Sequence, residues 1–280
     1  MKKTLNQTIG LEKRYNGRGF SSTDLRGGML DINPYLILTE FNMSHPFFPP
    51  HPHAGVSVAT YIFPDSEGAF INRDSKGDHS RIEAGGLHLT QAGVGMQHEE
   101  VPEVAGVNVH GMQIWINHSA ENRLSEALAY HAKSKEIPEI IMDKAKIRVI
   151  FGNVGDVQAA ITPLTPVVLL DVYIQANAEI DIPMPEGMQG VIMVLEGKGI
   201  LNETTPVSAL SGVSFGNTGD SLSVKTNETE IHFLITAGEP IHEPIVYGGP
   251  FVMNTTDQLL ETKRRFSRGE MGVLEPSVSF

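Results

Sequence analysis

Residues 56–63, VSVATYIF, show the pattern that decides the fold. Similar short runs, rich in Val, Ile, Phe and Tyr, recur between clusters of Gly, Pro, Asn and Asp; they are YLILTEF (35–41), HGMQIWI (110–116), IRVIF (147–151), PVVLLDVYI (166–174), GVIMVL (190–195) and IHFLIT (231–236). Many short strands separated by turn residues are typical of a β-sandwich or β-barrel. The sequence therefore predicts an all-β protein.

Two segments have the spacing of a helix instead of the alternation of a strand. SAENRLSEALAYHAKSKE (119–136) begins with Ser119, a residue type that caps helices, and TTDQLLETKRRFSRG (255–269) ends at Gly269. We expect both segments to form short helices that pack on the surface of a barrel.

The chain has 280 residues, which is enough for two domains of about 140 residues each. The halves share a strand rhythm, and each has a glycine-centred hairpin, DSEGAFINRDSKGD (65–78) and LEGKGILNETT (195–205). This similarity indicates a duplicated domain. We expect one β-barrel domain over residues 1–140 and a second over residues 141–280 that ends in a helix.

The composition argues against several kinds of protein. A formal net charge of −12 disfavours direct nucleic-acid binding, since phosphate binding needs a basic surface. The chain has no cysteine, so any metal must be held by imidazole and oxygen ligands. The first residues contain lysines but no apolar stretch, and no later segment is apolar enough to span a bilayer. We expect a cytoplasmic protein that makes no membrane contact.

Histidines gather in the first half of the chain, which holds nine of the eleven. In FPPHPHAG, His51 and His53 are two residues apart at the start of a strand, so both imidazoles project to the same side. His98 and Glu100 have the same spacing in AGVGMQHEEVP. Either pair alone is more often a surface or hydrogen-bonded pair. On adjacent strands of one barrel, however, the four side chains can converge on a single metal ion.

Three imidazoles and one carboxylate suit a divalent transition metal. A six-coordinate ion would keep about two positions open for water, O₂ or substrate oxygens. Iron(II) suits these ligands, and nickel, copper, manganese and zinc are all chemically admissible. The sequence does not choose among these metals.

Five motifs resemble those of the pirin family and occur in the same order; they are FPPHPHAG (48–55), INRDSKGD (71–78), AGVGMQHEEVP (92–102), GMQIWIN (111–117) and GGPFVMNT (248–255). The resemblance covers most of the chain and implies two cupin-type β-barrels, or double-stranded β-helices, in tandem. It places the metal ligands of the family on His51, His53, His98 and Glu100. It also implies that the metal is iron and that the second cupin domain holds none.

The sequence departs from this family pattern at two positions. Ala54 and Val94 stand where the family usually has arginine. An arginine can steer an anionic substrate or hold a carboxylate by two parallel hydrogen bonds. Without these guanidinium groups we expect a more apolar mouth around the metal.

Several other side chains have two interpretations. Glu99 should project to the face opposite Glu100, where we expect a surface charge. His88 either lines the first barrel or is a hydrogen-bonded core histidine. Trp115 and Met112 either pack in the core or form a wall against which a substrate stacks.

The resemblance leaves three functions open. The first is a dioxygenase that uses O₂ to open flavonols such as quercetin, a small aromatic substrate. In it, Glu100 is either a metal ligand or the catalytic residue that takes the hydroxyl proton of the substrate. The second is a redox-sensitive regulator, similar to a transcriptional co-regulator, whose metal alters its contact with a protein partner. The third is a cupin that has lost activity and keeps its metal for stability.

Overall fold

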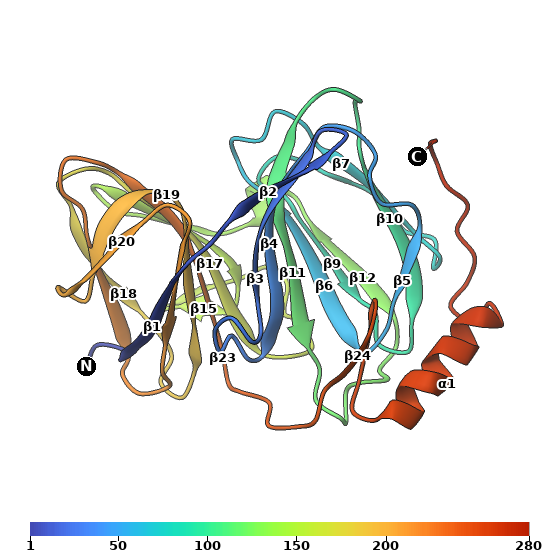
Figure 1. Ribbon diagram of the computed structural model, residues 1–280. Helices are drawn as coiled ribbons and strands as arrows, with labels where there is room; N and C mark the ends of the chain where they lie inside the picture. Colours follow the sequence, from blue (N-terminus) through green and yellow to red (C-terminus); the bar gives the residue numbers. More distant parts are fainter. Residues whose placement is uncertain (280) are drawn as a thin grey trace.

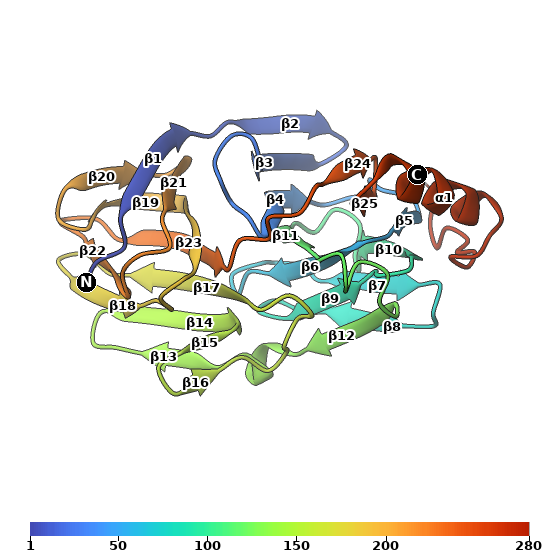
Figure 2. The ribbon, with the colours of Figure 1, turned by 90° about the horizontal axis from the view of Figure 1, so that it is seen from below.

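The computed structural model describes residues 1–279, which form two β-barrels that lie side by side (Figures 1 and 2). In the first barrel, a seven-stranded sheet faces a four-stranded sheet, and all neighbouring strands are antiparallel. The seven-stranded sheet has, in spatial order, β12 (Leu128–Ala132), β9 (Leu87–Gln91), β6 (Val56–Ile62), β11 (Val109–Asn117), β4 (Tyr35–Met43), β3 (Phe20–Arg26) and β2 (Lys13–Gly17). The four-stranded sheet has β5 (His51–His53), β10 (Met96–Pro102), β7 (Phe70–Asp74) and β8 (His79–Ile82). The predicted all-β fold is confirmed.

The second barrel is built from one ten-stranded sheet. Its main path has β1 (Leu5–Gly10), β21 (Ser211–Phe215), β19 (Gln189–Leu201), β23 (Ile231–Gly238), β17 (Val167–Ile174), β14 (Ala145–Phe151) and β13 (Glu139–Ile141). The remaining three strands are β18 (Glu179–Pro183), β20 (Thr205–Ser208) and β22 (Ser221–Lys225). Two separate two-stranded sheets are β15 (Asn153–Val154) with β16 (Val157–Gln158), and β24 (Val246–Gly248) with β25 (Phe251–Met253).

The two ends of the chain each pack on the more distant barrel. Strand β1 pairs with β21 of the second barrel, so the N-terminus lies there (Figures 1 and 2). The C-terminal strands β24 and β25 and the helix α1 lie against the first barrel, where Phe251 bridges to Ala54 (Figure 2). The boundary near residue 140 stays a prediction, and the first and last segments of the chain each complete the barrel of the other half.

One of the two predicted helices is present. Helix α1 (Thr256–Ser267) begins after Thr255, whose hydroxyl accepts a hydrogen bond from the backbone N–H of Gln258. The helix predicted over residues 119–136 was wrong, because that segment contains β12 and a single 3₁₀ turn, Ser134–Glu136. Backbone pairing of β12 with β9 outweighs the helical spacing, which is a weak preference. Neither described helix combines the length and apolar character needed to cross a membrane.

A large apolar core lies between the barrels and buries one face of β6. Ala59 and Tyr61 of β6 face this inter-barrel core, whereas Thr60 points into the first barrel toward Glu100. The interior of the second barrel is filled by its own apolar cluster, which includes Phe215 and Phe233. Histidine and carboxylate side chains instead enter the interior of the first barrel, where a cavity forms.

Candidate metal centre

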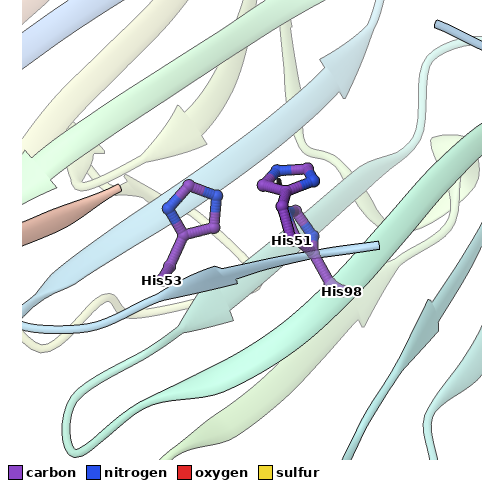
Figure 3. Close-up of side chains that lie close together, drawn as sticks. All are labelled: His51, His53 and His98. Carbon is purple, nitrogen blue, oxygen red and sulfur yellow. Dashed lines mark hydrogen bonds between the residues drawn. The ribbon is translucent and has the colours of Figure 1, made fainter. Parts of the chain in front are cut away.

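The short strand β5 brings three histidines together. His51 and His53 lie at its two ends and project to the same side, as the alternation of a strand predicts. Strand β10 pairs with β5 so that His98 lies directly opposite His51. Figure 3 shows the resulting group, with two imidazoles rising from β5 and the third from β10.

The three imidazoles converge closely. One nitrogen from each ring lies within 4.8 Å of the others, and the Nε2 atoms of His51 and His98 are 3.2 Å apart. The ring of His53 has its centre 5.0 Å from that of each of the other two rings. Three of the four predicted ligands are therefore in position to share one ion.

Several buried polar atoms at this place have no hydrogen-bond partner among the described residues. They are both ring nitrogens of His53, Nδ1 of His98 and Oε1 of Glu100. Buried polar atoms are usually paired in proteins, so the unpaired atoms of His53 and Glu100 leave room for a further partner at this place. Because imidazole nitrogens and a carboxylate oxygen are ligands of divalent transition metals, these residues fit such an ion.

The surroundings keep the imidazoles neutral, which is the form that binds a metal. Burial lowers the pKa of His51, and it lowers the pKa of His53 and His98 well below the ordinary histidine value. The Nδ1 of His51 lies 2.9 Å from the carbonyl oxygen of Pro49. If Nδ1–H donates to this carbonyl, Nε2 is the nitrogen that faces His98 with a free lone pair.

Glu100 enters the same cavity, but it is not among the three donors that lie within 4.8 Å. Its Oε2 accepts hydrogen bonds from the Thr60 hydroxyl at 2.9 Å and from the Gln113 amide at 3.3 Å, which leaves Oε1 free. Burial raises the pKa of Glu100 to about 7, although these two hydrogen bonds act in the opposite direction. Its place as the fourth ligand stays a prediction.

The histidine group opens onto a cavity of about 890 Å³ between the two sheets of the first barrel. Aromatic side chains form part of its wall and include Phe41, Phe47, Phe48, Phe70 and Trp115. The Trp115 ring meets the His53 ring edge-on, with the ring centres 4.9 Å apart. Trp115 is thus a wall of the cavity, whereas Met112 packs in the inter-barrel core.

Comparison with known proteins identifies the family. The family model described as Pirin matches residues 31–116, and the Pirin C-terminal cupin domain matches residues 169–272. Pirin-like protein 2 of Arabidopsis thaliana is 35% identical over 86% of this chain and 76% of its own length. The chain belongs to the pirin family. Both the resemblance and the tandem cupin fold predicted from the sequence are confirmed.

Two further relatives extend the pirin comparison. Pirin of Homo sapiens is 29% identical over 88% of this chain and 86% of its own length. The crystal structure of quercetin 2,3-dioxygenase from Acinetobacter baumannii superposes with a TM-score of 0.87 at 26% identity, and the match covers 97% of this chain and 99% of that one. The chain is therefore a pirin-family cupin that is structurally similar to a quercetin 2,3-dioxygenase.

Glu99 corrects one expectation for this pirin-family chain. Its side chain does project away from Glu100, but it is buried and not a surface charge. Arg73 of β7 donates to its Oε2 at 2.8 Å, and the backbone N–H of Ser277 donates to its Oε1 at 3.1 Å. The C-terminal segment covers the outer face of β10, which no local pattern in the sequence predicts.

The same C-terminal segment packs around the two positions without arginine. Ala54 is fully buried in an apolar cluster with Phe251 and Met271, so its side chain faces away from the cavity. Gly55 has a positive φ of 74°, and an added Cβ would lie 1.9 Å from the carbonyl oxygen of Val252. At the other turn, Arg265 of α1 donates to the carbonyl of Val94 at 2.9 Å. The segment thus packs against the turns after both ligand strands.

Three other histidines of the first barrel contact polar groups outside the metal centre. The Nε2 of His118 lies 2.7 Å from the Ser57 hydroxyl, and Nε2 of His110 lies 3.0 Å from Oε1 of Glu40. His88 of β9 is buried inside the first barrel between the two sheets, with Nδ1 at 3.4 Å from the hydroxyl of Ser80 on β8, so it is a core histidine.

Proposed function

We propose that this protein is a metal-dependent dioxygenase that uses O₂ to open flavonols of the quercetin type. The observation that carries the proposal is the position of the histidine group and Glu100 at one end of an aromatic cavity of about 890 Å³. Cavities of this size with apolar walls and a few polar groups are typical of small-molecule sites. The 26% identity to a quercetin 2,3-dioxygenase over nearly the whole chain supports this reaction.

Each group of cavity residues has its own role in the proposed reaction. His51, His53 and His98 would hold the ion, which we propose is iron(II); when bound, it supplies a Lewis acid and a site for O₂ chemistry. The phenylalanine walls hold a flat aromatic substrate and exclude water. The free Oε1 of Glu100 is placed to accept the proton of a substrate hydroxyl. Thr60 and Gln113 hold the other oxygen, so the carboxylate keeps its orientation.

Turnover of quercetin tests the proposal. Iron-loaded protein should bleach the visible absorbance of quercetin while it takes up O₂, and His53→Ala should abolish both signals. His79→Ala is the matched control, because His79 lies exposed on β8 outside the cavity and its replacement should leave turnover intact. Absence of turnover with iron, nickel, copper, manganese and zinc alike would contradict the proposal.

Glu100→Gln separates the two roles of this carboxylate. Loss of the proton acceptor should lower kcat about 100-fold or more. If Glu100 acts only on the proton, the variant should still bind one metal ion, whereas loss of the metal would establish it as the fourth ligand. Full activity of Glu100→Gln would contradict both roles.

A second candidate function is metal-sensitive binding of a protein partner. The observation that favours it is that Phe48 is both exposed and close to the histidine group. Its surface is 42% accessible, and its ring centre lies 6.2 Å from that of His51. A change in metal charge next to an exposed aromatic side chain can alter a binding surface. Pulldowns with the ferrous, ferric and metal-free protein should then give different partners, and identical sets would contradict this function.

A further inference from the structure

Strands β2 and β3 form the outer end of the cavity, because their lining residues Arg14 and Arg26 are exposed whereas Glu100 at the metal centre is buried. Arg14 and Asn16 of β2 and Ser22, Asp24 and Arg26 of β3 line this rim. The stretch KRYNGRGFSSTDLR (13–26) has four basic side chains and one acidic side chain, a net charge of +3. The whole chain has a net charge of −12, so the rim is a local basic region on an acidic protein.

The acidic group of the rim is already paired. Nη2 of Arg26 lies 3.1 Å from Oδ2 of Asp24, and the Thr39 hydroxyl donates to Oδ1 of Asp24 at 2.7 Å. Both carboxylate oxygens are therefore engaged, and Arg26 and Asp24 cancel in charge. Arg14 forms no ion pair within residues 1–279. The rim consequently presents one uncompensated guanidinium to the cavity.

An aromatic wall connects this guanidinium with the metal centre. The rings of Phe20, Phe47 and Phe48 pack together, with ring centres 4.5 to 5.3 Å apart. Phe48 in turn lies beside His51. A ligand that fills the cavity therefore meets polar ligand atoms at its inner end, aromatic rings along its body and a positive charge at its outer end.

We propose that the rim is a subsite for an anionic substituent, and that the substrates of this protein are anionic conjugates of flavonols, held at the outer end by Arg14. This inference rests on the proposed function, which assigns the inner end of the ligand to the metal centre. A guanidinium can donate two parallel hydrogen bonds to two oxygens of a carboxylate or of a sulfate. A sulfate conjugate and a glucuronide share this chemistry.

Ligand binding to the whole protein under anaerobic conditions tests the subsite without turnover. Trp115 is the only tryptophan of the chain and lines the cavity, so its fluorescence reports occupancy. The probes are quercetin, its 7-sulfate and 4′-sulfate, and its 7-glucuronide and 4′-glucuronide. At least one conjugate should bind about tenfold more tightly than quercetin, since a hydrogen bond to a charged group contributes on this scale. Comparison of the sulfates with the glucuronides identifies which anion the rim prefers.

Two variants locate the effect. Arg14→Gln should remove the preference for the conjugate and leave the affinity for quercetin unchanged. Arg18→Gln is the matched control, because Arg18 lies between β2 and β3 but does not line the cavity, and it should keep the preference. Equal affinity of the wild type for quercetin and every conjugate, or a preference that survives Arg14→Gln, would overturn the subsite. Tight, Arg14-dependent binding without turnover would instead contradict only the proposed dioxygenase activity.

Discussion

Replacement of Arg73 should destabilise the protein more than replacement of its partner Glu99. The Glu99 side chain is 1% exposed, whereas that of Arg73 is 27% exposed. Arg73→Gln leaves a buried carboxylate whose described hydrogen bonds come only from the backbone N–H of Ser277. Removal of one partner of a buried ion pair costs about 3–5 kcal/mol, and we expect the lower end because Arg73 is partly solvated.

Glu99→Gln preserves the shape and an acceptor oxygen for Ser277, and the released Arg73 can turn to water. Loss of a hydrogen bond to a charged group then costs about 1.5 kcal/mol, the lower end of the usual range, because Arg73 regains contact with water. Urea unfolding of the metal-free protein, followed by Trp115 fluorescence, should therefore rank Arg73→Gln below Glu99→Gln by about 1.5 kcal/mol. The double variant should be more stable than Arg73→Gln alone. If Glu99→Gln is the more damaging change, or the two effects simply add, the buried pair does not act as described.

Two further substitutions test other parts of the fold. Burial lowers the pKa of His118 from 6.5 to about 4, so the unfolded chain binds a proton that the native chain does not. The contribution of His118 to the free energy of unfolding should be constant above pH 6.5 and should fall by about 2–3 kcal/mol toward pH 4. Urea titrations across this pH range should show a smaller fall for His118→Asn than for the wild type. An equal fall in both proteins would contradict a lowered pKa of His118. Tyr61→Phe removes a 2.7 Å hydrogen bond to buried Asp171 that joins the two barrels. It should lower the free energy of unfolding by about 1–3 kcal/mol in the same assay. Tyr15→Phe, at an exposed residue, is the control, and an equal effect of both substitutions would refute the role of Tyr61.

Short-range rules predicted each histidine-containing pair of the site, and the resemblance to the pirin family brought the two pairs together. His51 and His53 share a face because side chains alternate along a strand, and His98 joins them through direct pairing of β5 with β10. The absence of cysteine and the concentration of histidine in the first half added independent support. The spacing within each pair and the composition are visible in the sequence, whereas the pairing of β5 with β10 is a long-range contact that only the family resemblance indicated.

Contacts between residues far apart in the chain could not be predicted. The alternation rule placed Glu99 on the correct face, but Ser277, 178 residues later, covers that face. The hairpin of β2 and β3 likewise reaches the cavity through sheet order, which no periodicity in residues 13–26 indicates. In the segment 119–136, strand pairing outweighed a helical spacing that has little energetic weight by itself.

The metal content of tag-free protein tests the central claim most directly. After loading with iron(II) under anaerobic conditions and removal of free ions, elemental analysis should find one metal ion per chain in the wild type and in the control His79→Ala. His98→Ala should keep its circular dichroism spectrum but lose the bound metal, because only two of the three converging imidazoles remain. A full equivalent of metal in His98→Ala, or none in the wild type with any of the five candidate metals, would contradict the account.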